Sequence, residues 1–338
     1  MQRPTLLAAA ALCSTFALGT LPSFARAADV EIKLGTLAPK GSTWDVLIKE
    51  MAEEWSKASD GKVKLRVFPG GVLGNEGDMV RKMRVGQLSA AALTVVGLHD
   101  ITPEPEAISA PMVVESYEEL DFVMSKMTPQ LEKKLEEKGY VVLAWSEVGE
   151  VHFFSTRALH TPEQAKEAKL FAWEGDPASV DAWKAAGLRP VVLSATDIVP
   201  SLQTGMIDTV ATAPLYALTA RMYQKADHMM EMSWAIVIGA TVVKKELWEK
   251  VPADKQQRLL EISRAYGRRI ALEVRKMNGE AIAKMKSQGL KVEKTEDLAG
   301  WRAAAERANQ IVRGKVVPAA VFDEVLKYRN EYRAQHKK

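Results

Sequence analysis

Residues 168–177 read AKLFAWEGDP. The run 169–173 has the length and composition of a short buried strand, and the Gly-Asp-Pro after it predicts a turn that opens a helix. Val-Val-Leu follows at 191–193, then a helix opened by Thr196-Asp197 and closed by the run 205–208. This order of strand, helix, strand and helix predicts an α/β fold with a parallel sheet, whose strand ends point at a cleft.

The residues at these strand ends are almost all apolar. Aromatic residues in strands usually belong to a core, but the same residues facing a cleft form the wall of a ligand site. Both interpretations stay open on the pattern alone. The residues concerned are Val151, Phe153, Phe171, Trp173, Ala211, Ala213 and, further along the chain, Trp234.

The first hundred residues predict a βαβαβ unit. Strands are expected at 31–36, 63–67 and 90–96, and helices from about 43 and over 76–85. The first helix carries one apolar stripe, and the loops at 37–42, 70–75 and 95–100 are expected at the same edge of the sheet. The stripe consists of Trp44, Leu47, Ile48, Met51, Ala52 and Trp55.

The rest of the chain predicts a second lobe and a long connecting helix. A strand at 141–145 precedes the crossover, and a strand at 235–243 returns the chain to the first sheet. The helix predicted over 252–288 could run about 50 Å and lie across both lobes. We expect lobe I at 28–147 and about 235–275, lobe II at 148–234 and about 276–305, and a C-terminal helix and tail at 306–338. The last helix itself is expected over about 299–328, so it begins within the second lobe.

The N-terminus has the layout of a secretory signal. Arg3 precedes an apolar run at 6–18, and the small-residue site at 25–27 predicts cleavage before Ala28, hence export to the periplasm. A membrane anchor is the alternative, but the run is shorter than the roughly 20 residues that a span requires. The only cysteine, Cys13, lies in this leader. The mature chain would then contain no disulfide, thiolate metal site or cysteine nucleophile.

Other functional classes find little support in the sequence. The net charge is +3 without a Lys/Arg run, which gives no argument for nucleic acid. The five histidines are scattered, so no metal site is expected. The glycine-rich run 70–75 lacks the features of a P-loop or dinucleotide fingerprint, so no cofactor is expected either. Glu147 and Glu150 could form an acid–base pair in an exported enzyme, although their spacing is a common accident.

Five runs together resemble the extracytoplasmic solute receptors of TRAP transporters. The similarity covers nearly all of the mature chain, in family order. It implies a two-domain periplasmic binding protein, type II-like, with a long helix spanning both lobes, which delivers a small-molecule solute to the membrane subunits of an ion-gradient-driven permease. The runs are 32–35 (IKLG), 64–75 (KLRVFPGGVLGN), 83–88 (MRVGQL), 194–197 (SATD) and 202–208 (LQTGMID).

The resemblance also implies where this chain departs from acid-binding receptors. Typical members hold an organic acid through an arginine at the position of Phe171, a second arginine at that of Val151 and an asparagine at that of Ala213. Here all three positions are apolar. The resemblance therefore implies a receptor for a largely apolar or weakly polar solute, of the kind that acts beside a tetratricopeptide-repeat accessory protein.

Further candidate ligand-binding residues lie in the same strand ends and loops. They are Thr36, Trp44, Asn75, Val96, Glu150 and Trp234, and His152, Glu174 and Asp176 could add polar contacts. Two rivals from binding classes remain open. An acid receptor could use another cation, such as Lys40, and a scaffold could fill the cleft with its own side chains.

Overall fold

The computed structural model describes residues 30–174 and 177–336. The predicted signal segment, Cys13 and Asp176 lie outside the described residues. Within the described ranges, no helix is both long enough and apolar enough to cross a membrane.

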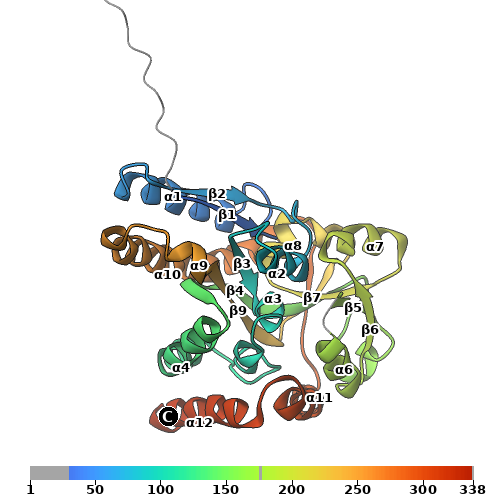
Figure 1. The fold of residues 1–338 in the computed structure, drawn as a ribbon. Helices are drawn as coiled ribbons and strands as arrows, with labels where there is room; N and C mark the ends of the chain where they lie inside the picture. The colour runs from blue at the N-terminus through green and yellow to red at the C-terminus, as the bar shows by residue number, and fades with distance from the viewer. Residues whose placement is uncertain (1–29, 175–176, 337–338) are drawn as a thin grey trace, which may run out of the picture.

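The first lobe is the predicted βαβαβ unit (Figure 1). β1 (Val30–Thr36) pairs in parallel with β2 (Val63–Phe68) on one side and β3 (Ala90–Thr94) on the other. α1 (Thr43–Ala58) and α2 (Glu76–Arg84) connect them. The strand predicted to continue to 96 instead ends at Thr94, whose side chain accepts a hydrogen bond from the Val96 amide and so starts the short helix α3 (Val95–His99).

Two long antiparallel strands carry the chain between the lobes. β9 (Ala235–Lys244) pairs with β3 and with β4 (Tyr140–Ser155), which has 16 residues where the sequence predicted a strand over 141–145. The register of this pair is irregular between Glu147 and Gly149, and Gly149 has a φ of 106° that favours glycine. This bulge lies beside the predicted lobe boundary at 147/148. The boundaries themselves stay a prediction.

The second lobe continues the same sheet. β7 (Thr209–Thr212) and β6 (Arg189–Leu193) flank β5 (Lys169–Trp173), and both pairings are parallel. The strand order is β2-β1-β3-β9-β4-β7-β5-β6, with β8 (His228–Met230) and β10 (Lys291–Glu293) off this path. The helices of this lobe are α5 (Pro162–Ala165), α6 (Pro177–Ala185), α7 (Ile198–Thr204) and α8 (Pro214–Thr219).

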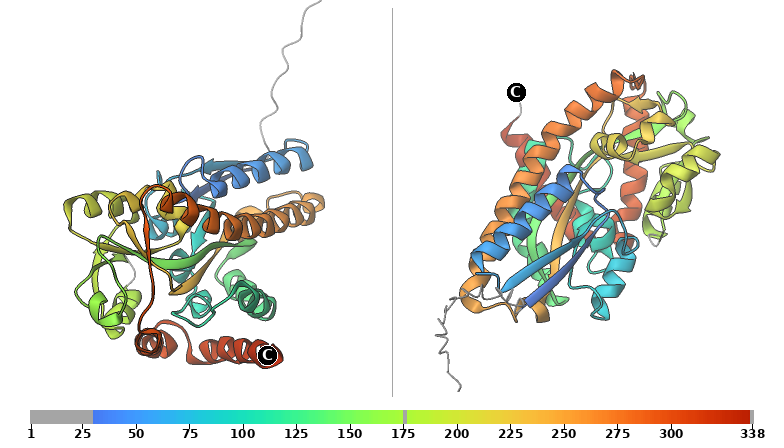
Figure 2. Two further views of the ribbon diagram at one scale, coloured as in Figure 1. Left: turned by 180° about the vertical axis from the view of Figure 1, so that it is seen from behind. Right: turned by 90° about the horizontal axis from the view of Figure 1, so that it is seen from above.

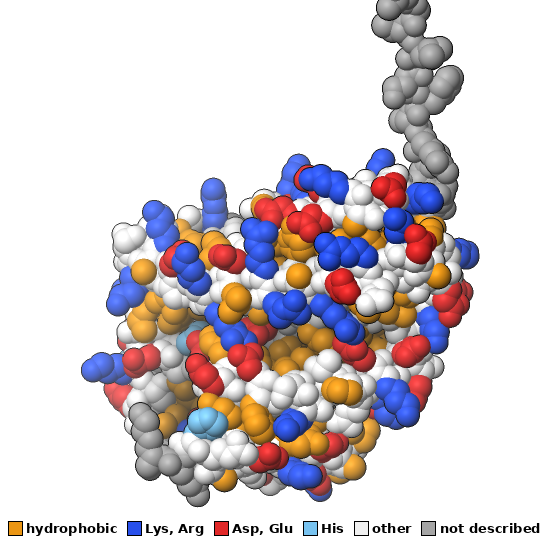
Figure 3. All heavy atoms as spheres, turned by 90° about the vertical axis from the view of Figure 1, so that its left-hand side faces the viewer, with side chains coloured by type: hydrophobic (Ala, Val, Ile, Leu, Met, Phe, Trp, Pro, Cys, Tyr) orange, Lys and Arg blue, Asp and Glu red, His pale blue; other side chains and the backbone are white. Residues whose placement is uncertain are grey.

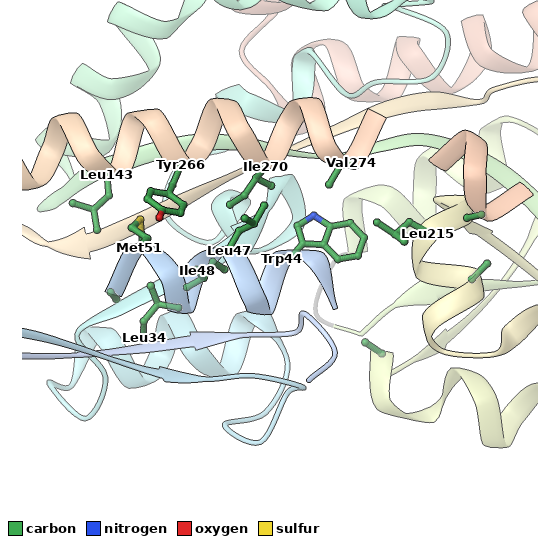
Figure 4. Packing of buried hydrophobic residues seen from close by; sticks show 14 of the residues in the cluster. Leu34, Trp44, Leu47, Ile48, Met51, Leu143, Leu215, Tyr266, Ile270 and Val274 are labelled. Atoms are coloured by element: carbon green, nitrogen blue, oxygen red, sulfur yellow. The ribbon is translucent and has the colours of Figure 1, made fainter. Parts of the chain in front are cut away.

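The long helix is α10 (Ala253–Lys286), which follows the short α9 (Lys245–Trp248) and has 34 residues. It packs on α1 and β4 and reaches α8 of the second lobe (Figure 2). Figure 4 shows Trp44, Leu47 and Met51 of α1 turned toward Tyr266 and Ile270 of α10, as the apolar stripes predict. The sequence thus correctly predicted the helix that bridges the lobes.

The C-terminal segment differs from the prediction of one helix over 299–328. α11 (Leu298–Ile311) and α12 (Ala319–Gln335) are separate helices. Gly314, with a φ of 95°, breaks the helical path, and Pro318 precedes the first residue of α12. α12 packs on α4 (Tyr117–Glu137), beneath the first lobe in Figure 1.

The face drawn in Figure 3 carries basic and acidic side chains intermingled. Hydrophobic side chains are exposed in hollows between them. Ion pairs also join α10 to α4, for example Arg264–Glu132 and Arg275–Asp121. The face therefore presents no single-signed charge field.

Candidate ligand-binding site

Two cavities lie where the lobes meet. Cavity A has a volume of about 130 Å³ and cavity B about 150 Å³. Residues of both lobes line cavity A, among them Thr36, Trp44, Ile48, Glu76, Thr94, Val148, Phe171, Trp173, Ile198, Ala211, Thr212, Tyr216, Gly239, Thr241 and Ile270. Cavity B is lined by residues that include Val95, Val96, Glu106, Val151, Trp173, Ala182, Trp183, Ala211, Trp234, Val237 and Ala308.

Neither cavity has a lysine or an arginine among its lining residues in the described part of the chain. The guanidinium of Arg275 borders a different cavity, where its Nε donates to Glu147 at 2.9 Å and the group also pairs with Asp121. Glu147 itself lines cavity A. Both carboxylates pair with this guanidinium. Among the described residues, no lysine or arginine therefore lines cavity A or B to pair with a carboxylate ligand.

Glu76 and Glu147 are both buried carboxyl residues that line cavity A, and Glu147 is paired with Arg275. Glu76 opens α2, and its side chain bridges to the end of β3. Oε1 accepts a hydrogen bond from the Thr94 amide at 2.9 Å, while Oε2 accepts from Thr94 Oγ1 at 2.8 Å and from the Gly97 amide at 2.7 Å. Burial raises the pKa of this carboxyl above its usual value, and the hydrogen bonds only partly oppose that effect. The group is an acceptor that is costly to keep charged.

Tyr216 brings a phenol into the same cavity from α8. Burial raises its pKa, and the charge of Glu76 raises it further, so the phenol stays protonated and able to donate. Cavity A thus combines the Glu76 carboxyl with several hydroxyl groups, which can both donate and accept. Such groups recognise a hydroxyl or amide of a ligand and offer nothing to balance a negative charge.

Aromatic rings form much of the remaining wall. Phe171 and Trp173 of β5 meet edge to face with centroids 5.3 Å apart. Trp44 is fixed by a hydrogen bond from its Nε1 to the Glu147 carbonyl at 3.0 Å, across the cleft floor (Figure 4 shows its ring between α1, α10 and Leu215). In cavity B, Trp183 and Trp234 stack with centroids 5.6 Å apart. These walls favour apolar or aromatic ligand surface.

The structure brings most of the predicted site residues to the two cavities. Thr36, Trp44 and Phe171 line cavity A, Val96, Val151 and Trp234 line cavity B, and Trp173 lines both. Phe171 is 4% exposed and also borders cavity A, so its position is compatible with both the core and the cleft interpretation.

Four predicted residues do not line either cavity. Asn75 caps α2, where its side chain accepts from the Asp78 amide at 2.9 Å. Phe153 is fully buried among the rings of Trp183, Trp234 and Trp301. Ala213 is buried at the start of α8, and Glu150 lies beside Tyr117, whose hydroxyl accepts its backbone N–H at 3.2 Å.

The additional polar candidates have structural partners. His152 is buried, and its Nδ1 lies 3.0 Å from the Met230 carbonyl, while burial lowers its pKa. Glu174 and Lys40 are exposed.

The sequence analysis did not predict Glu76, Tyr216 and Trp183 as cavity residues. Glu76 directly follows the run 64–75, and this position could have indicated a place near the site. A glutamate in the first turn of a helix, however, ordinarily interacts with the helix dipole and does not line a cavity.

The family model for bacterial extracellular solute-binding proteins, family 7, matches residues 34–313. The chain belongs to this family. A solute-binding protein of Roseobacter denitrificans is 26% identical over 78% of this chain and 82% of its own length. The C4-dicarboxylate-binding periplasmic protein DctP of Rhodobacter capsulatus is 26% identical over 71% of this chain and 72% of its own.

Solved TRAP periplasmic solute-binding proteins share the fold. One from Ralstonia eutropha, with bound (S)-2-acetolactate, superposes with a TM-score of 0.82 at 20% identity, covering 89% of this chain and 99% of its own. One from Pseudomonas putida, with bound D-glucuronate, gives a TM-score of 0.81 at 19% identity, covering 89% and 97%. The family and these neighbours are binding proteins, so the chain is a solute receptor and not an enzyme using Glu147 or Glu150.

Proposed function

We propose that this receptor binds an uncharged, largely apolar solute between its lobes and delivers it to the membrane subunits of a TRAP-type permease. The observation that carries the proposal is that no lysine or arginine of the described chain lines cavity A or B. Delivery in the periplasm follows from the family, and the cavities between the lobes argue against a pure scaffold. A tetratricopeptide-repeat accessory partner remains a prediction from the resemblance.

The free energies favour this ligand class. An arginine–carboxylate pair contributes about 1.5–3 kcal/mol, whereas burying a carboxylate without a partner costs several kcal/mol. An acid in cavity A would also lie near the buried Glu76 carboxylate, and the two like charges would repel. Apolar ligand surface instead contributes about 25 cal/mol for each Å² that leaves water.

A sugar acid or other organic acid is the second candidate, because the solved neighbours carry D-glucuronate, L-galactonate and similar acids. It requires a cation from outside the lining residues. Lys40 belongs to the loop whose neighbouring residue Pro39 lines cavity A, so it is the residue to replace. If this candidate is right, Lys40→Ala abolishes acid binding.

Native mass spectrometry of the exported protein, followed by organic extraction, tests the proposal. We expect a co-purified uncharged molecule whose removal lowers the melting temperature. Thermal shift with D-glucuronate and L-galactonate is the companion measurement, and we expect no stabilisation. An empty protein that either acid stabilises, and that loses this response on Lys40→Ala, would overturn the proposal in favour of the acid receptor.

A further inference from the structure

We propose that cavities A and B are consecutive compartments of one site, and that the solute is an elongated, uncharged molecule that occupies both. The inference rests on the proposed function and goes further by fixing the shape of the ligand. Each compartment alone is small, at about 130 and 150 Å³. Together they offer room for a chain or for linked rings.

The strands β9 and β4 border both compartments, each through residues that follow one another along the strand. On β9, Gly239 borders cavity A and Val237 borders cavity B; on β4, Val148 borders A and Val151 borders B. A step of two or three residues along a strand is about 7–10 Å. The two cavities therefore lie side by side along the cleft floor and not at unrelated places.

Trp173 and Ala211 border both cavities, on the neighbouring strands β5 and β7. Trp173 is only partly buried, and its ring meets Phe171 edge to face. Ala211 presents a single methyl group. The partition between the compartments thus consists of one indole and one small side chain, so a ligand can pass along the indole face.

The compartments differ in chemistry, which orients the ligand. Three donors bind the Glu76 carboxylate in cavity A, and an ionised carboxylate has about four acceptor positions, so one remains for a ligand hydroxyl. Cavity B offers the stacked rings of Trp183 and Trp234, and its carboxylate, Glu106, is paired with His99 Nδ1 at 2.5 Å. The hydroxyl end therefore lies in cavity A and the hydrocarbon or aromatic end in cavity B.

A series of primary alcohols tests this arrangement with the unaltered mature protein. Binding of 1-hexanol to 1-dodecanol is measured by displacement of N-phenyl-1-naphthylamine, whose fluorescence rises in apolar cavities. If one site runs through both compartments, affinity increases about fourfold for each added CH₂ across the series, the equivalent of about 0.8 kcal/mol. A plateau within the series, in the absence of any effect of the variant below, would overturn the inference.

Ala182→Leu places extra volume in cavity B only. Ala182 is buried on α6 and lines that cavity. We expect this variant to keep the affinity for 1-hexanol and to lose at least tenfold for 1-dodecanol. Ala271→Leu is the matched control, because Ala271 lies on α10 beside a separate groove. Equal affinities of both variants for 1-dodecanol would also overturn the inference.

The two hypotheses fail differently. If the fluorescent probe and short alcohols bind but length has no effect, the receptor for an apolar solute stands and the two-compartment site does not. If neither the probe nor any alcohol binds to protein freed of co-purified molecules, the proposed apolar ligand class itself fails.

Discussion

At the scale of the residue, Phe171 is where we expect the choice between acidic and apolar solutes to be made, because it lines cavity A. It is buried, packs on Trp173 and stands where acid-binding relatives are expected to carry an arginine. We predict that Phe171→Arg lowers the free energy of unfolding by about 3 kcal/mol, because the ring contacts are lost and a guanidinium is buried. Millimolar D-glucuronate should restore part of that loss by pairing with the new cation. Thermal melts with and without the acid measure both effects.

Val192→Arg provides the control for that prediction. Val192 lies on the neighbouring strand β6 and is 48% exposed, so the same new charge stays in water. Its melting temperature should be unchanged and should not respond to D-glucuronate. A response in both variants would indicate non-specific binding of the acid, and a response in neither would contradict the role assigned to position 171.

Glu76 gives a pH dependence whose sign follows from its raised pKa. The native state holds this proton to higher pH than the unfolded chain, where the value is near 4.5, so the native state binds more protons in between. The contribution of Glu76 to stability is therefore fully present below pH 4.5 and is lost as pH rises through the native pKa. The glutamine of Glu76→Gln cannot ionise, so this variant does not lose stability in this way as pH rises.

Urea unfolding of the unaltered protein and of Glu76→Gln at a series of pH values from 4 upward tests that sign. Glu76→Gln should be less stable throughout, by about 1–3 kcal/mol, because its NH2 group replaces one of the two accepting oxygens and so faces either the Thr94 or the Gly97 amide donor. The difference in the free energy of unfolding between the two proteins should become smaller as pH rises. Parallel pH profiles would show that the carboxyl titrates alike in both states.

At the scale of the element, the contact of α10 with β4 depends on Gly267. A Cβ at this position would stand 2.4 Å from the Trp145 carbonyl oxygen and 2.8 Å from Ala144 Cβ. We predict that Gly267→Ala destabilises the protein by about 1–3 kcal/mol, because the helix must move away from the strand. Urea unfolding of the two proteins measures the change.

Gly279→Ala in the same helix is the matched control. A Cβ there would meet nothing within 4 Å, so the substitution should stabilise the helix by up to about 1 kcal/mol through its better propensity. If both alanines stabilised the protein, close approach of α10 to β4 would not be the reason for the glycine.

The sequence predicted those elements that depend on interactions between residues close together in the chain. The stripes on α1 and α10 repeat every three or four residues, so both helices and their mutual packing were predictable. The length of β4 was not, because its pairing with β9 joins residues about a hundred positions apart. The break between α11 and α12 had a local signal in Gly314 and Pro318, which the apolar pattern outweighed.

The candidate site shows the same limit. Phe171 and Trp173 were found because they stand at the end of a recognisable strand. Trp183 and Tyr216 belong to helices whose faces are decided by the packing of the whole lobe, so only the structure brings them to the cavities. Phe153 lies two residues after Val151 on β4, so both side chains are expected on the same face of the strand. The rings around Phe153 nevertheless make it a core residue.

At the scale of the whole molecule, hydrogen bonds and a loop contact join the two lobes around the cleft. Asn278 of α10 accepts the Leu215 amide of α8 at 2.9 Å and donates to the Val148 carbonyl at the bulge of β4. At the mouth of the cleft, a Cβ on Gly71 would lie 3.7 Å from Thr196 Cγ2. The loop 69–74 of the first lobe thus nearly touches the loop 194–197 of the second. We expect a solute to enter cavity A as these loops separate.

We therefore predict an opening motion about the β4 bulge and the long helix, of the kind known for two-lobed receptors. Val72→Cys and Val192→Cys place spin labels on opposite lobes at positions 70% and 48% exposed, in a chain whose one cysteine lies in the predicted leader. Protein freed of co-purified molecules should show a long, broad distance distribution by double electron–electron resonance. 1-Dodecanol should shift it to a shorter and narrower one, because the bound chain contacts both lobes. One unchanged short distance in both samples would mean that the lobes do not open, and the solute would then need another path into the cleft.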